Sequence, residues 1–373
     1  MKKFVCRLLL FLIPFYLVGL FIGFIYYVGW TTGELVDFDQ LIEGQRQDHD
    51  IFIGMGYNEQ TAYYKLENAN YYQADVIALG TSRVMQFRID YFFPDFYNCG
   101  GAVSWNYDEY LNFLKNLNYT PEVIIVGLDQ WVFNDAWNQH GVSYRTKIPI
   151  DMLDRNSMSI GWAMMKDLFN RKWNIHTIEN YPMNYGVNGQ IKDSGFQWDG
   201  SYYYGNAYRE PTAQEDYMFA NTFDRIAGGY GRFEWGDHVD DKTYEYLEVL
   251  LEYCNENGIM VIGFAPPFAP SVYDRMIDSG NYGYLGEISP KCEEIFGQYG
   301  YEYFDYTDIS VLGVGDAYFV DGFHGGEVAY AYMVEDMLVQ ESCLRKYVNE
   351  ELLKELLDNR YSEFLLKEFI HGE

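Results

Sequence analysis

Three short apolar runs constrain the fold of this chain more than any other feature of its sequence. Residues 76–79, 123–128 and 259–264 are runs of strand length without a polar side chain. Such runs are typical of parallel strands that are buried on both faces. Helical patterns precede the second and third runs, as in βαβ units. The sequence therefore predicts a parallel sheet with helices on both of its faces.

Two weaker patterns extend this sheet. Further strands are expected at 95–99 and 303–306, which gives about five strands and a doubly wound, flavodoxin-like α/β domain. We expect Asn106 and Glu109 to form a capping box at the start of a helix. The helices are predicted at 106–117, 157–170, 241–257 and 327–339.

The N-terminal segment predicts one transmembrane helix. Residues 8–30 are uncharged and largely apolar, and a helix of this length covers the roughly 30 Å hydrocarbon core. A cleavable signal peptide is the alternative, but the run is longer than a signal's apolar region and no small-x-small site follows it. Lys2, Lys3 and Arg7 predict a cytoplasmic N-terminus. We therefore expect a single-pass protein of the cell membrane whose C-terminal domain is extracytoplasmic.

The sequence suggests four successive parts. Residues 1–30 form a cytoplasmic tip and membrane anchor, and residues 31–72 an irregular juxtamembrane segment. Residues 73–342 form the α/β domain, with an insertion at about 135–232 that lacks the strand and helix alternation. Residues 343–373 are an amphipathic, acidic C-terminal helical tail, which we expect to dock on protein and not on a membrane.

The composition limits the partners. The net charge is −29, and because three basic residues lie in the anchor, residues 31–373 carry about −32. This charge argues against nucleic acid, and against anionic lipid as the main partner. Aromatic residues make up 19% of the chain, with 37 tyrosines, which suits either a carbohydrate-rich setting or simply a tyrosine-rich surface. The five cysteines lack paired or metal-like spacing and no phosphate loop is present, so we expect no metal and no cofactor.

A serine, a histidine and an acid form the candidate catalytic group. Ser82 follows the apolar run at 76–79, at the strand end where open α/β sheets bind their ligands. Asp321 precedes His324 by three residues, a spacing at which a carboxylate reaches the ring nitrogen and fixes its tautomer. Ser82 is then the nucleophile, His324 the general base and Asp321 its orienting acid. An ordinary turn or cap serine is the alternative.

Four segments in chain order resemble the four blocks of the SGNH/GDSL hydrolase superfamily. They are 80–82 (Gly-Thr-Ser), 98–101 (Asn-Cys-Gly-Gly), 127–130 (Gly-Leu-Asp-Gln) and 321–324 (Asp-Gly-Phe-His). The membrane anchor is similar to that of exported members that act in D-alanyl transfer and alginate O-acetylation. The resemblance implies a serine esterase or O-acyltransferase acting on a cell-envelope polysaccharide or teichoic-acid-like polymer. A cell-envelope glycan or acyl donor and a membrane-bound acyltransferase are the implied partners.

The third block departs from the family pattern. The family places an asparagine of the oxyanion hole where this chain has Asp129, and a carboxylate cannot donate to an oxyanion. The resemblance then leaves the backbone amides of Ser82 and Gly101, with Gln130 as a substitute donor if the loop is shifted. Asp129 can instead pair with Arg83 beside the nucleophile. The alternative function is therefore a catalytically degenerate scaffold that binds polymer or a membrane acyltransferase.

Overall fold

A five-stranded sheet, with every neighbouring pair of strands parallel, forms the core of this computed structural model. The strand order is β2-β1-β3-β6-β7, which is the doubly wound order of flavodoxin-like folds. The α/β class predicted from the apolar runs is confirmed. The strands are β1 (Val76–Gly80), β2 (Phe96–Gly100), β3 (Val123–Gly127), β6 (Met260–Ala265) and β7 (Glu302–Asp305). The structure describes residues 2–93, 95–103, 106–137, 147–150, 154–178, 181 and 184–368.

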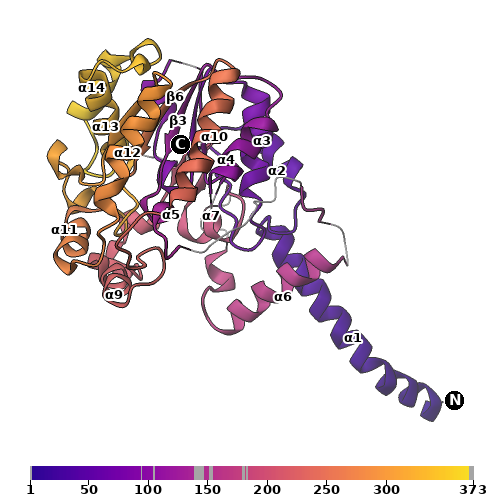
Figure 1. The fold of residues 1–373 in the computed structure, drawn as a ribbon. Coiled ribbons are helices and arrows are strands. Elements are labelled where there is room, and N and C mark those ends of the chain that lie inside the picture. Colours follow the sequence, from indigo (N-terminus) through magenta and orange to yellow (C-terminus); the bar gives the residue numbers. More distant parts are fainter. Residues whose placement is uncertain are drawn as a thin grey trace. The chain divides into compact units, whose positions relative to one another are not determined.

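Helices cover both faces of the sheet. In Figure 1, α4 and α10 lie side by side on one face and α13 lies on the opposite side. A short second sheet pairs β4 (Gly195–Phe196) with β5 (Tyr202–Tyr203). The α-helices are α1 (Lys2–Thr31), α2 (Phe38–Gln47), α3 (Thr61–Tyr72), α4 (Tyr107–Lys115), α5 (Gln130–Phe133), α6 (Arg155–Phe169), α7 (Val187–Lys192), α8 (Asn206–Arg209), α9 (Ala220–Gly228), α10 (Asp241–Glu256), α11 (Pro270–Ser279), α12 (Leu285–Gln298), α13 (Glu327–Val339) and α14 (Glu350–Asp358).

Two local expectations were wrong. The juxtamembrane segment is not irregular, because it contains α2 and the whole of α3, and α2 buries the apolar side chains of Phe38, Leu41 and Ile42. The capping box at α4 does not form, since the Asn106 side chain makes no cap hydrogen bond. For α2, tertiary burial decides the local structure, as it does for most helices in proteins.

Glycines at the strand ends let the segment after β1 approach the sheet. Gly80 ends β1 and Gly127 ends β3, and a Cβ on either of them would collide with the side chain of Val84. Val84 belongs to the 3-10 turn η1 (Ser82–Val84), which follows β1 directly. The absence of a side chain at these two glycines therefore lets this turn pack closely against the carboxyl edge of the sheet.

The chain divides into two compact units. The first consists of residues 1–60 and 147–195, and the second of residues 61–146 and 196–373. The predicted insertion at 135–232 is thus shared between the units. The second unit contains the whole five-stranded sheet and the C-terminal tail, in which Leu353, Leu356 and Leu357 of α14 are buried.

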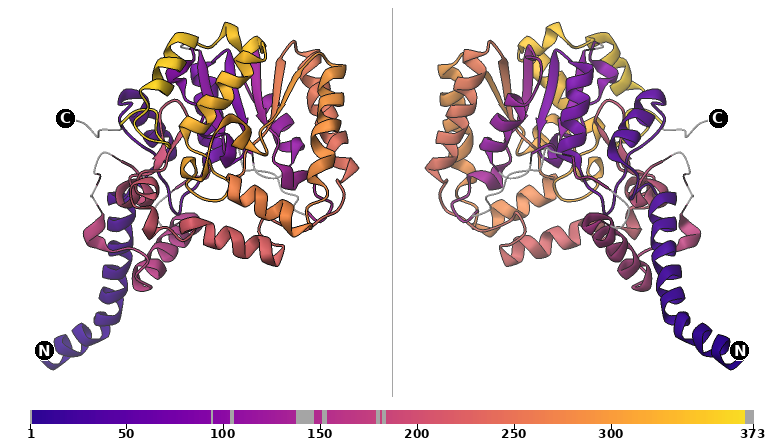
Figure 2. Two further views of the ribbon diagram at one scale, coloured as in Figure 1. Left: turned by 90° about the vertical axis from the view of Figure 1, so that its left-hand side faces the viewer. Right: turned by 90° about the vertical axis from the view of Figure 1, so that its right-hand side faces the viewer.

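Helix α1 is long and apolar enough to cross a membrane. Figure 2 shows it as one continuous helix in both views. Its side chains from residue 3 to residue 20 are all exposed, which is unlike the core helix of a soluble protein. A membrane anchor and a signal sequence share these properties.

One carboxylate organises the chain just after α1. Glu34 is fully buried and accepts hydrogen bonds from the backbone amides of Gly56 (2.7 Å), Tyr57 (3.0 Å), Asn58 (2.8 Å) and Val187 (2.8 Å). Burial raises the pKa of Glu34, while these four hydrogen bonds act in the opposite direction. Glu34 therefore ties together segments of the first unit that are more than 150 residues apart in sequence.

A buried lysine joins β2 to the segment that follows β4. The ammonium nitrogen of Lys65 donates to the carbonyl oxygens of Asn98 (3.0 Å) and Gly200, and it lies 4.1 Å from the ring centroid of Phe196. Lys65 is inaccessible to solvent. Burial lowers its pKa from 10.5 to about 7. A neutral amine retains two N–H donors, so both hydrogen bonds persist when the proton is lost.

This lysine should make stability depend on pH. Because the pKa of Lys65 is lower in the folded chain than in the unfolded chain, the unfolded chain holds the extra proton between pH 7 and 10.5, and stability rises with pH there. Between about pH 6.5 and about pH 9.5, the free energy of unfolding of the wild type should rise by about 3 kcal/mol more than that of Lys65→Met. Denaturant titrations of the full chain in detergent would measure this.

The exposed Lys354 provides the control. Lys354→Met should keep the pH dependence of the wild type. If the free energy of unfolding depended on pH in the same way for the wild type and for Lys65→Met, Lys65 would not be the group responsible for the rise in stability.

Candidate active site

The structure brings Ser82, His324 and Asp321 into one hydrogen-bonded chain. Ser82 Oγ lies 2.8 Å from His324 Nε2, and His324 Nδ1 lies 2.7 Å from Asp321 Oδ2. Ser82 opens the turn η1 at the carboxyl end of β1, and the other two residues come from the loop before α13. All three are partly exposed. This geometry allows the histidine to accept the serine proton while the carboxylate holds the ring.

Three hydrogen bonds hold the loop that contains Asp321 and His324, which we call the Asp321 loop. Asp321 Oδ1 accepts from the amides of Phe323 (3.0 Å) and His324 (2.8 Å), and the Gly322 amide donates to Asp216 Oδ2 (3.2 Å). Burial raises the pKa of Asp321, but the charge of His324 and these hydrogen bonds outweigh it, so the pKa lies below its ordinary value. The carboxylate is therefore ionised and can stabilise a charged imidazole.

Arg83, next to Ser82, connects the loops that carry the candidate site. It is fully buried, and each of its five N–H groups has an oxygen acceptor. Its guanidinium carbon also lies 5.0 Å from the ring centroid of Trp131 and 4.5 Å from that of Phe268. The acceptors are Phe323 O (3.1 Å), Asp129 Oδ1 (3.2 Å), Gln130 Oε1 (2.6 Å), Pro266 O (2.7 Å) and Pro267 O (2.6 Å).

The structure thus places Asp129 in a buried ion pair with Arg83. Both side chains are almost inaccessible to solvent. Burial raises the pKa of Asp129, and the charge of Arg83 and a hydrogen bond from Thr81 oppose this effect. A buried charge of this kind depends strongly on its partner, because the partner replaces the lost hydration.

Two of the three expected oxyanion donors are engaged elsewhere. The Gly101 amide donates to the carbonyl oxygens of Gly80 (2.8 Å) and Thr81 (3.0 Å). The side-chain amide of Gln130 donates to Pro266 O (2.7 Å) and Thr307 Oγ1 (2.9 Å). Of the three backbone and side-chain amides considered from the sequence, only that of Ser82 has no hydrogen bond within the described ranges. Loss of a single donor typically costs about 10²–10³ in rate.

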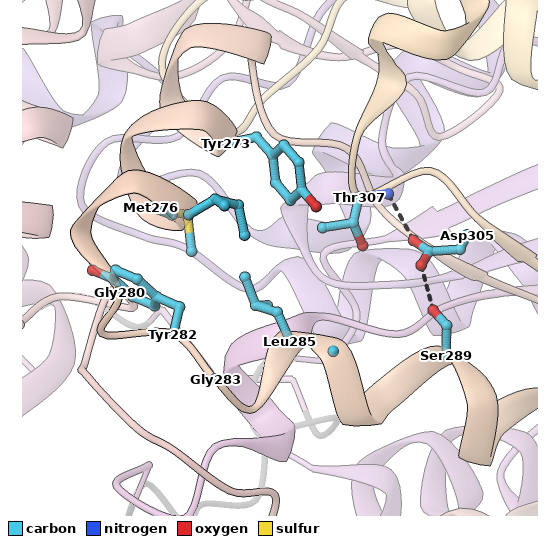
Figure 3. Close-up of a pocket in the computed structure, with 11 residues that line it drawn as sticks. Tyr273, Met276, Gly280, Tyr282, Gly283, Leu285, Ser289, Asp305 and Thr307 are labelled. Atoms are coloured by element: carbon cyan, nitrogen blue, oxygen red, sulfur yellow. Dashed lines mark hydrogen bonds between the residues drawn. The ribbon is translucent and has the colours of Figure 1, made fainter.

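A polar pocket lies at the β7 end of the same edge of the sheet. Its volume is about 410 Å³, and its lining includes Tyr273, Tyr282, Ser289, Asp305 and Thr307. In Figure 3, Tyr273 extends toward Thr307, and Asp305 accepts hydrogen bonds from Ser289 and from the Thr307 amide (2.8 Å). Aromatic, hydroxyl and carboxylate groups together suit a polyhydroxylated ligand. Through Thr307 the pocket is connected to Gln130 and hence to Arg83.

A second, more apolar pocket lies beside the Asp321 loop. It has a volume of about 580 Å³. Phe319 and Val320, which line it, immediately precede Asp321. The ring of Tyr204 lies between His324 (6.2 Å between centroids) and Phe364 (6.0 Å), and Phe364 also lines this pocket. An apolar group of a ligand can therefore be accommodated close to His324.

Comparisons with protein-family models, with curated proteins and with solved structures find no match to this chain. Within the described residues, no group of three or more His, Cys, Asp or Glu side chains is arranged to hold a metal ion. The five cysteines are free. The chemistry of the site must therefore be argued from its own geometry.

The sequence did not identify the carbonyl acceptors of Arg83. Pro266 and Pro267 directly follow β6, and both of their carbonyl oxygens accept hydrogen bonds from the guanidinium. A pair of prolines at the carboxyl end of a buried strand was the available signal, because it leaves carbonyl groups outside the sheet ladder. Phe323 O and Thr307 have no comparable signal in the sequence.

The variant Asp129→Asn separates the two roles considered for this position. Because Asp129 compensates the buried charge of Arg83, the substitution should lower the free energy of unfolding by about 3 kcal/mol and lower any esterase activity with it. Denaturant unfolding and aryl acetate hydrolysis would be measured on the same preparation. Asp278→Asn, on the exposed side of α11, is the matched control and should change neither. Higher activity at unchanged stability would identify Asp129 as a degenerate oxyanion position instead.

Proposed function

We propose that this chain is a membrane-anchored, extracytoplasmic serine esterase or O-acyltransferase of SGNH type, acting on a cell-envelope polysaccharide or teichoic-acid-like polymer. The observation that carries the proposal is the hydrogen-bonded chain from Ser82 through His324 to Asp321. Its position at the carboxyl edge of a doubly wound sheet is the usual place for a ligand in such folds. The four sequence blocks resembling SGNH hydrolases give the same assignment.

In the proposed reaction, Ser82 Oγ attacks the carbonyl carbon of an acyl ester. His324 takes the serine proton, and Asp321 stabilises the resulting imidazolium. The tetrahedral intermediate then expels the alcohol, which receives the proton from His324, and the acyl group remains on Ser82. A sugar hydroxyl or water next attacks this acyl-enzyme, losing its proton to His324, and Ser82 is released. A sugar hydroxyl gives transfer and water gives hydrolysis.

The two pockets fit the two substrates of such a reaction. The polar pocket around Tyr273 and Asp305 suits a stretch of polymer, and the apolar pocket beside Phe319 suits the apolar part of an acyl donor. Of the two proposed polymers, the strong negative charge of the chain favours a neutral polysaccharide over an anionic, teichoic-acid-like polymer.

A catalytically degenerate scaffold is the second candidate. Its support is the engagement of the Gly101 and Gln130 amides, together with the carboxylate at position 129. Such a scaffold would bind the polymer or a membrane-bound acyltransferase without forming an acyl-enzyme. Chemical labelling of Ser82 distinguishes the two candidates.

The full-length protein in detergent should react with a fluorophosphonate and hydrolyse a small aryl acetate slowly. Ser82→Ala and His324→Ala should abolish labelling, and Asp321→Asn should lower the rate by up to about 10⁴ because the histidine tautomer is lost.

Two controls accompany this experiment. Ser310→Ala, at an exposed serine outside the site, should leave labelling unchanged. The triad variants should unfold at nearly the wild-type temperature, because these side chains are partly exposed. An unlabelled, inert wild type that still binds an envelope glycan would favour the scaffold.

The membrane assignment rests on α1 and its flanking charges. Val28 of α1 packs in the core of the first unit with Met164, Trp173 and Val187, so cleavage after the apolar run would remove a core residue. This packing favours a retained anchor over a signal sequence. Lys2, Lys3 and Arg7 lie on the short N-terminal side, which favours a cytoplasmic N-terminus.

Protease added outside intact cells should therefore degrade nearly the whole chain and leave only the anchor region. A tag at the C-terminus should disappear on an immunoblot, whereas a tag at the N-terminus should remain on a short fragment. A cytoplasmic protein blotted in parallel reports cell integrity. Survival of the C-terminal tag in intact cells, with loss after lysis, would reverse the orientation.

A further inference from the structure

Helix α6 presents a stripe of aromatic and basic side chains to solvent. Trp162 is 64% exposed and Phe169 is 72% exposed. Arg155, Ser159 and Lys166 are exposed as well. The spacing along these five residues alternates between three and four, so they lie on one face of the helix. We call them the α6 stripe.

The opposite face of α6 is fixed to α1. Gly161 faces Ile25 so closely that a Cβ would collide with it, and Met164 packs with Val28. At the edge of the stripe, the rings of Trp162 and Phe21 meet edge to face with 6.5 Å between centroids. Helix α6 is therefore positioned along the part of α1 between Phe21 and Val28.

The place of this contact along α1 gives the depth of α6 relative to a bilayer. Side chains from residue 3 to residue 20 of α1 are all exposed. Eighteen residues span about 27 Å, close to the roughly 30 Å thickness of the hydrocarbon core. The lipid-facing part of α1 is therefore residues 3–20 and not the whole run 8–30 that the sequence predicts. Lys3 and Arg7 lie at its inner end, where long basic side chains reach the headgroups. The first contact with α6, at Phe21, comes directly after this stretch. Helix α6 thus lies at the height of the lipid headgroups on the side where α1 leaves the membrane.

The segment that contains α6 has a net charge opposite in sign to that of the whole chain. Residues 154–178 carry a net charge of +2, with histidine neutral, in a chain of net charge −29. Anionic headgroups attract basic side chains near the surface, and tryptophan and phenylalanine side chains partition into the interfacial region. The basic residues of the segment are Arg155, Lys166, Arg171 and Lys172.

We propose that α6 lies in the membrane interface beside α1, with Trp162 and Phe169 inserted among the lipids and with Arg155 and Lys166 on anionic phospholipid headgroups. Continuity with α1 and the local positive charge favour phospholipid over a protein partner as the occupant. The inference is independent of the chemistry at Ser82. It gives the first unit a second attachment to the bilayer.

An environment-sensitive nitrobenzoxadiazole label tests this in the full-length chain. Cys6 and Cys343 are replaced by serine, since the other three cysteines are buried. The label is placed at Phe169→Cys, or at Val339→Cys as the control, because Val339 is 74% exposed on α13. In vesicles of phosphatidylcholine and phosphatidylglycerol, lipid-borne nitroxides should quench the label at 169 about threefold more than the label at 339.

Charge reversal tests the headgroup contact. Arg155→Glu combined with Lys166→Glu should lower the ratio of inserted to free α6 by about 30-fold, if each basic residue contributes as usual near an anionic surface. Quenching at 169 should then fall to the level at 339. Both side chains are exposed, so an unchanged unfolding temperature in detergent confirms the fold.

Two results would overturn the proposal. A label at 169 that stays as exposed to water as the label at 339 would mean that lipid does not cover the stripe, and that a protein partner is its occupant. Strong quenching at 169 that is unchanged by Arg155→Glu combined with Lys166→Glu would mean that anionic headgroups do not hold α6 at the membrane.

Discussion

The arrangement of the candidate site depends on one buried cation. Arg83 gives all five of its N–H groups to oxygen atoms from the loops after β3 and β6 and from the loop that carries His324. It is itself the neighbour of Ser82. This guanidinium therefore links the turn that carries Ser82 to the loop that carries His324. A planar donor with five fixed directions suits this role in a way that a lysine ammonium does not.

This role also explains why a carboxylate stands where the resembling family has an oxyanion donor. A buried guanidinium needs a counter-ion, and Asp129 supplies it from the end of β3. The same residue cannot both neutralise Arg83 and donate to an oxyanion. The site therefore combines a hydrogen-bonded serine, histidine and acid with few free donors. In the proposed esterase, this arrangement would suit slow chemistry or an acyl group that is activated in advance.

The sequence predicted the parts of the fold that depend on local pattern. The uninterrupted apolar runs at β1, β3 and β6 identified buried parallel strands, and the spacing of Asp321 and His324 matched a contact now seen at 2.7 Å. It did not predict α2, whose few apolar residues gain stability only on burial. Asp129 was one acceptor that the sequence suggested for Arg83. Three others were missed because they are backbone carbonyls, which every residue possesses. The grouping of residues 147–195 with the N-terminal segment depends on long-range contacts such as that of Glu34 with Val187.

Glu34 follows the last residue of α1 by only three positions and is bound by four amides of the first unit. The helix is thus joined to that unit without a flexible tether. A transmembrane helix tilts when the bilayer becomes thinner or thicker than its apolar length. In this protein, a tilt of α1 in the bilayer would also rotate the first unit, because the connection at Glu34 is rigid and a flexible linker would not transmit the motion. Membrane thickness would then become a mechanical input to the first unit.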